Sequence, residues 1–104
     1  MAQYAVTAPE WIYAQVDLSD NSTTVYNGPV LLRSVIVTTA TSAHVCPIQD
    51  NTTAVAALPA SAAAGTVVQC GDMILATSLV VDPNDAATGI ITVVYKPNHD
   101  GLAG

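Results

Sequence analysis

Residues 30–39 read VLLRSVIVTT, and this stretch decides the fold class. Valine, isoleucine and threonine dominate it, and their branched side chains fit the pleated surface of a β-sheet better than the surface of a helix. Strict alternation along a strand places Arg33, Val35 and Val37 on one face. The stretch therefore predicts a long β-strand with side chains that pack on both sides.

Short runs of the same kind recur along the chain. Each is rich in Val, Ile and Thr and is bounded by turn sequences such as YNGP, QDNTT, CGD and DPNDAATG. The strands that we expect are Thr23–Tyr26, Val30–Thr39, Ala43–Gln49, Thr53–Leu58, Thr66–Cys70, Ile74–Val81 and Ile90–Lys96. A spacing of about ten residues predicts an all-β fold, an antiparallel β-sandwich of jelly-roll or immunoglobulin-like type with about seven to eight strands.

The last of these runs, IITVVY at residues 90–95, is apolar on both faces. A strand of this kind lies either in the centre of a sheet or at a contact between subunits.

The chain of 104 residues has the size of one domain. Residues 1–20 differ from the rest and are expected to be an N-terminal arm or a first strand, followed by the sandwich at 21–97 and a flexible tail at 98–104. The first segment contains the single tryptophan and two of the four tyrosines. Its large side chains predict a contact with the sandwich itself or with a neighbouring subunit, and a sugar-binding face is the alternative. These side chains are Tyr4, Trp11, Ile12 and Tyr13.

The charge balance excludes several classes of partner. The chain has two basic and eight acidic residues and a net charge of −6. Such a chain cannot neutralise a row of phosphates or bind an anionic membrane surface, so we expect no nucleic-acid and no membrane partner. It has no run of about 18 apolar residues and no basic segment at its start that would indicate a secretory signal. Charged residues make up only 10% of the chain, so the surface is either a weakly charged extracellular one or is partly covered by other subunits, and the second alternative is favoured.

Residues 42–50, SAHVCPIQD, contain the pair that comes closest to a reactive site. Zinc could draw on four ligands, which are His44, Cys46, Cys70 and His99, but none of these form the tight pairs that structural zinc sites use. A Cys–His nucleophile lacks a group that would orient the histidine. We expect free buried thiols, with a Cys46–Cys70 disulfide as the open alternative. We therefore expect no metal and no cofactor.

The acidic residues of DPNDAATG resemble the start of a calcium loop. The EF-hand pattern requires an oxygen ligand and then a glycine at its fifth and sixth positions, where this chain has Ala86 and Ala87. A type I turn is expected instead. The other carboxylates are scattered, no pair stands out as acid and base, and we expect the protein not to be an enzyme.

The order of these segments resembles small β-sandwich virion proteins of tailed bacteriophages, of the head decoration or cement type. The similarity spans about residues 28–96: a glycine, a Leu-rich strand that ends VIVTTA, then HVCPIQDNTT, ALPASAAAG and ATSLVVDPNDAATGIITVVY. The resemblance implies a structural protein, often a homotrimer, that is made in the host cytoplasm and binds the major capsid protein on the capsid surface. The N-terminal side chains named above would then provide the capsid contact. The alternative is a tail, fibre or spike component that binds a host receptor or glycan.

Overall fold

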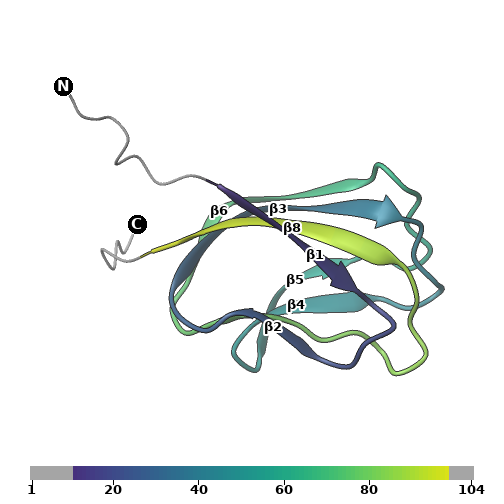
Figure 1. The fold of residues 1–104 in the computed structure, drawn as a ribbon, viewed down its shortest axis with the longest axis horizontal. Helices are drawn as coiled ribbons and strands as arrows, with labels where there is room; N and C mark the ends of the chain where they lie inside the picture. The colour runs from purple at the N-terminus through teal and green to yellow at the C-terminus, as the bar shows by residue number, and fades with distance from the viewer. Residues whose placement is uncertain (1–10, 99–104) are drawn as a thin grey trace.

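A computed structural model describes residues 11–98 and shows an all-β protein with two packed sheets (Figure 1). Every strand pair is antiparallel. The strands are β1 (Ile12–Asp17), β2 (Thr23–Tyr26), β3 (Val30–Thr39), β4 (Cys46–Asp50), β5 (Thr53–Leu58), β6 (Val67–Leu75), β7 (Leu79–Val81) and β8 (Ile90–Pro97). Within this part of the chain, no helix is long and apolar enough to cross a membrane.

The strand order is that of a jelly roll. One sheet has the order β1-β8-β3-β6 and the other has the order β2-β7-β4-β5. The pairs β4·β5, β3·β6, β2·β7 and β1·β8 are those of one long hairpin wrapped around itself, which is the arrangement that gives a double-sheet sandwich. The predicted antiparallel sandwich is therefore confirmed, and the jelly roll is the topology that this chain adopts.

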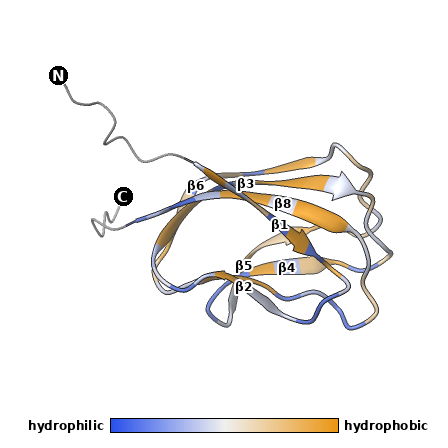
Figure 2. Ribbon diagram, viewed as in Figure 1, coloured by the Kyte–Doolittle hydropathy of each residue, from blue (hydrophilic) through white to orange (hydrophobic). Residues whose placement is uncertain are grey.

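The core lies between the two sheets and consists of aliphatic side chains from both. Figure 2 shows the hydrophobic segments along the strands of both layers. Leu32, Ile48, Leu79 and Ile91 are each exposed by 1% or less. Burial of such side chains is the main favourable term in folding.

Strict alternation fails in β3, because the strand contains a β-bulge. Its register shifts between Leu32 and Ser34 against both neighbouring strands. The extra residue reverses the phase of the strand, so Arg33 points to solvent while Val35 and Val37 are buried in the core. The prediction that these three residues share a face is wrong for this reason.

The predicted boundary at CGD is also wrong, since Gly71 and Asp72 lie inside β6. Both have a positive φ, of 68° and 57°, and they form a bulge that opposes the bulge of β3. The chain turns later, at residues 76–78, where the Asp50 carboxylate accepts three backbone N–H groups. The predicted strand Ile74–Val81 is thereby divided between β6 and β7.

Residues 40–45 form a loop, although the sequence predicts a strand that begins at Ala43. The loop bonds to two other loops instead of a neighbouring strand: Thr41 N–H donates to the Ala62 carbonyl and Ser42 N–H donates to the Thr88 carbonyl. Gly89 permits this approach, because a Cβ atom there would lie 2.9 Å from the Ala40 carbonyl oxygen.

β1 shows that part of the N-terminal segment belongs to the sandwich. Val16 within the strand and Leu18 directly after it are buried in the core. β8 lies between β1 and β3, and this central position explains why it is apolar on both faces. Tyr4 and His99 lie outside the described residues.

Candidate functional site

The site that the structure assembles is the outer face of the β1-β8-β3-β6 sheet, the face that points away from the core. In β1 the odd-numbered residues point to this face, because Val16 points into the core. In β8 the same face carries Val94, the partner of Tyr13, and Lys96. We call this surface the outer face.

Trp11 is the centre of a cluster at one end of the outer face. The guanidinium carbon of Arg33 lies 3.6 Å from the centroid of its ring, and the Nζ of Lys96 lies 4.6 Å from it. Both distances fall within the range of cation–π contacts. Arg33 and Lys96 are the two basic residues of the chain, so all of its basic side chains meet at one aromatic ring.

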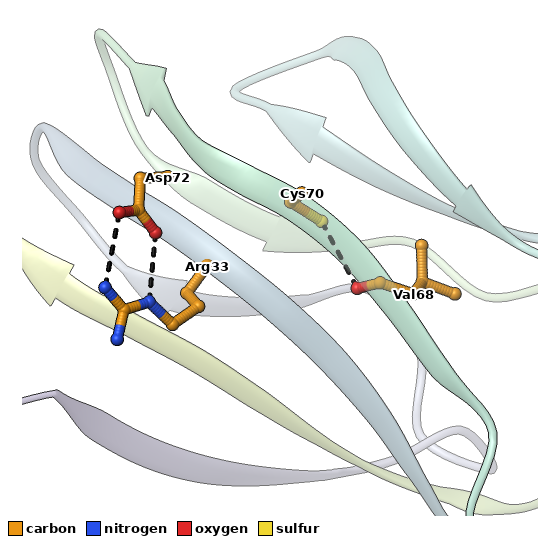
Figure 3. A network of polar contacts seen from close by, with 4 residues as sticks. All are labelled: Arg33, Val68, Cys70 and Asp72. Atoms are coloured by element: carbon orange, nitrogen blue, oxygen red, sulfur yellow. Dashed lines mark hydrogen bonds and ion pairs between the residues drawn. The ribbon is translucent and has the colours of Figure 1, made fainter.

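Asp72 fixes the orientation of Arg33. Its Oδ1 accepts from Nε at 3.0 Å and its Oδ2 accepts from Nη2 at 3.2 Å, as Figure 3 shows. The two side chains project from the opposed bulges of β3 and β6, so the bulges place them within reach of each other. The hydrogen bond with Asp72 raises the pKa of Arg33, and the same bond lowers the pKa of Asp72. Because the pair is exposed, its main effect is to hold the guanidinium over the ring rather than to stabilise the fold.

The rest of the outer face combines exposed hydrophobic side chains with polar ones such as Gln15, Asp17 and Gln69. Tyr13 is 67% exposed, Val67 is 46% exposed and Ile74 is 36% exposed. Val94 lies among them and is only 3% exposed. Tyr13 lies on the edge strand β1, and Val67 and Ile74 lie on the opposite edge strand β6. Exposed hydrophobic side chains on a sheet can form part of an interaction surface.

The N-terminal residues that the sequence singled out do not act as one group. Trp11 and Tyr13 belong to the outer face, whereas Ile12, 40% exposed, points to the opposite side of β1. Arg33 covers one face of the Trp11 ring, so that face is not available for stacking on a sugar. Alternation within β1 could have separated these residues, but Arg33 could not have been placed beside Trp11 without the tertiary structure.

Cys46 and Cys70 are free thiols and lie in different sheets. Burial, together with the charge of Asp82, raises the pKa of Cys46 to about 11, and burial also raises that of Cys70. The Cys70 Sγ faces the carbonyl of Val68 at 3.7 Å (Figure 3). Thiols in such surroundings are poor nucleophiles, because the thiolate is the reactive form.

His44 contacts a serine side chain. Its Nδ1 lies 3.1 Å from the Ser42 Oγ, which also accepts the N–H of Thr88 at 3.0 Å. The hydroxyl therefore bonds to both the imidazole and the Thr88 backbone and links two loops. Cys46, at 1% exposure, is buried in the core. Within residues 11–98, no group of three or more His, Cys, Asp or Glu side chains could hold a metal ion. The sequence interpretation did not identify this Ser-x-His contact, for which the spacing is the only signal.

The segment DPNDAATG contains a turn, as expected, but the turn is formed by Asn84–Ala87 and not by the four residues that begin at Asp82. The Asn84 Oδ1 accepts the N–H of Ala86 at 2.9 Å, and its carbonyl accepts the N–H of Ala87 at 2.9 Å. The asparagine thus supports the turn with its own side chain.

The outer face offers a partner exposed hydrophobic side chains among polar ones, with two cations and the Asp72 carboxylate at one end. No family model, characterised protein or solved structure matches the chain that carries it.

Proposed function

We propose that this protein is a capsid decoration protein of a tailed bacteriophage, which binds the major capsid protein and stabilises the head lattice. The observation that supports this proposal is the outer face, where large apolar side chains are exposed on a sheet. The jelly roll is an architecture of viral capsid proteins and of lectins alike, so the fold agrees with the proposal without selecting it. The sequence resemblance adds the second line of support.

The mechanism is the burial of surface without any chemical step. Tyr13 is the most exposed large hydrophobic side chain of the outer face, and tyrosine combines a large apolar area with few rotatable bonds. Arg33 and Trp11 are already ordered by Asp72, so little conformational freedom is lost when a partner covers them. Contacts that are weak in one copy add up when many copies bind one lattice.

The first test is the copy number in purified virions of the parent phage, measured by densitometry and mass spectrometry. A decoration protein is present in hundreds of copies, as expected for a lattice protein. A few copies per virion would indicate a tail, fibre or spike component instead. Absence of the chain from the virion would refute both functions.

The second test locates the contact on the outer face. Particles that lack the chain are mixed with purified protein, and bound protein is measured after sedimentation. Tyr13→Ser and Ile74→Ser are expected to reduce binding, because both remove apolar area from the outer face. Val45→Ser is the matched control, since Val45 is 56% exposed but lies in the loop before β4. Equal binding by all three variants would contradict this location.

A further inference from the structure

The four edge strands of the sandwich differ in how well they could pair with another strand. The edges are β1 and β6 in one sheet and β2 and β5 in the other. Three of them are irregular: β2 has an extra residue at Val25, β5 has one at Val55, and β6 is bulged at Gly71 and Asp72. Bulges disrupt the row of free backbone groups and protect an edge from further pairing. β1 has no such protection, since its register runs without a shift from Ile12 to Asp17.

The backbone groups that point to the free edge of β1 can be identified. Leu18 N–H donates to the Gly89 carbonyl at 2.9 Å, which continues the β1·β8 register by one residue. Hydrogen-bonded and non-bonded pairs alternate along an antiparallel ladder, so Ala14 bonds to β8 while Tyr13 and Gln15 direct their N–H and C=O groups away from it. No described strand pairs with this side of β1.

We propose that two copies of this chain pair through their β1 strands, antiparallel about a two-fold axis at Ala14, and so join their two four-stranded sheets into one. This inference does not depend on the proposed function. Two conditions narrow the register: residues that oppose each other must point to the same face, and the overlap must be as long as the strand allows. Axes at Ala14 and at Gln15 both meet them with five opposed residues of β1, and the axis at Ala14 is chosen because it also brings the basic side chains around Trp11 opposite Asp17. With Ala14 opposite itself, Tyr13 is opposite Gln15 and Ile12 is opposite Val16 of the second copy.

Charge complementarity favours a second copy as the occupant. The same register places Trp11, with Lys96 and Arg33 around it, opposite Asp17 of the other copy. The basic end of β1 therefore meets the acidic end of its partner twice, once on each side of the axis. The pairing also covers Ile12, which is 40% exposed, with an aliphatic neighbour. The two outer faces become one continuous surface with Tyr13 still accessible on it.

The register is tested by a single cysteine. Opposed residues of a non-bonded antiparallel pair have Cα atoms about 4.5 Å apart, which a disulfide can bridge. Ala14→Cys is expected to give a covalent dimer on mild oxidation. Gln15→Cys is the matched control, because in this register its two copies are too far apart. The unmodified chain controls for the native thiols. A covalent dimer from Gln15→Cys, or none from Ala14→Cys, would overturn the proposed register.

The free edge is tested by proline. Gln15→Pro removes an N–H that β8 does not use, and proline is tolerated on an edge strand in that orientation. The unmodified protein is expected to show twice the monomer mass by light scattering. The Gln15→Pro variant is expected to show the monomer mass and to keep an unchanged circular dichroism spectrum. Gln15→Ala keeps the N–H and should remain a dimer. If Gln15→Pro loses the circular dichroism spectrum of the folded protein, the oxidation of Ala14→Cys decides whether the β1 strands pair.

The charge contribution is tested by exchange. Lys96→Glu should weaken association, and Asp17→Lys in the same chain should restore it. Within one copy these residues lie at opposite ends of the β1·β8 ladder, so only contact between copies explains a rescue. A monomer at every concentration would show that the edge is closed in another way and would refute the pairing. A trimer, as the sequence resemblance implies, would refute the two-fold axis.

Discussion

The Asp50 carboxylate joins the end of β4 to the turn between β6 and β7. Replacing Asp50 should therefore lower the stability of the protein more than replacing any other aspartate. Its Oδ2 accepts from Ala76 N–H at 3.0 Å, and its Oδ1 accepts from Thr77 at 3.0 Å and Ser78 at 3.2 Å. Hydrogen bonds to a charged acceptor contribute about 1.5–3 kcal/mol each. The sum is smaller here, since Ala76 and Thr77 are exposed and water can replace the lost acceptor.

Two substitutions separate the charge from the hydrogen bonds. Asp50→Ala leaves the N–H of Ser78, a residue only 5% exposed, without its acceptor, and should lower the free energy of unfolding by about 2–4 kcal/mol. Asp50→Asn can keep the hydrogen bonds from Thr77 and Ser78, but its amide group faces the N–H of Ala76, which is also a donor. It should lower the free energy of unfolding by about 1–2 kcal/mol. For a domain of this size, the melting temperature should fall by about 4 °C per kcal/mol.

The pH dependence has a definite sign. Burial alone would raise the pKa of Asp50, but the N–H groups of Ala76, Thr77 and Ser78 outweigh it and hold the pKa below its ordinary value of 3.8. A depressed folded-state pKa gives stability that is complete above the ordinary value and is lost as the pH falls through the folded value. The difference in unfolding free energy between the unmodified protein and Asp50→Asn should therefore be constant from neutral pH to about pH 5 and shrink below pH 3.8.

Urea unfolding followed by circular dichroism measures these differences. Asp20→Asn is the matched control, because it removes the same charge from an exposed side chain that accepts no hydrogen bond from the described residues. An Asp50→Ala protein as stable as Asp20→Asn would refute the assigned role of the three hydrogen bonds.

Three further predictions follow from local geometry. Gly89→Ala should lower the free energy of unfolding by at least about 2 kcal/mol, because its φ of 119° is strained for alanine and the new Cβ atom would meet backbone atoms. Gly65→Ala, which has open space around the new Cβ atom, should lower it less in the same urea assay. Cys46 should resist alkylation at pH 8 in the folded protein and react after unfolding, because a pKa of about 11 leaves about a hundredfold less thiolate than the ordinary pKa of 9.0. Peptide mapping locates the alkylated thiol, and rapid reaction of Cys46 in the folded protein would contradict this prediction. Arg33→Ala should uncover the Trp11 ring, shift its fluorescence to the red and increase its quenching by acrylamide, whereas an unchanged spectrum would show that the ring is not covered in solution.

Strands with strong local signals could be predicted from the sequence to the residue. Thr23–Tyr26, Val30–Thr39 and Thr53–Leu58 have the predicted bounds, since β-branched runs between turn residues specify extended backbone locally. The errors at residues 40–45 and at Gly71 have a different origin. In each case the outcome depends on which distant backbone the segment bonds to.

The amino-acid sequence by itself determined that this protein is an antiparallel β-sandwich, because β-branched periodicity and turn chemistry act over a few residues. Only the tertiary structure decided the jelly-roll order, the bulge that turns Arg33 outward and the cluster around Trp11. The physical reason is sequence separation. Arg33 and Asp72 are 39 residues apart, and a strand register that brings them together is a property of paired strands, which no single segment encodes.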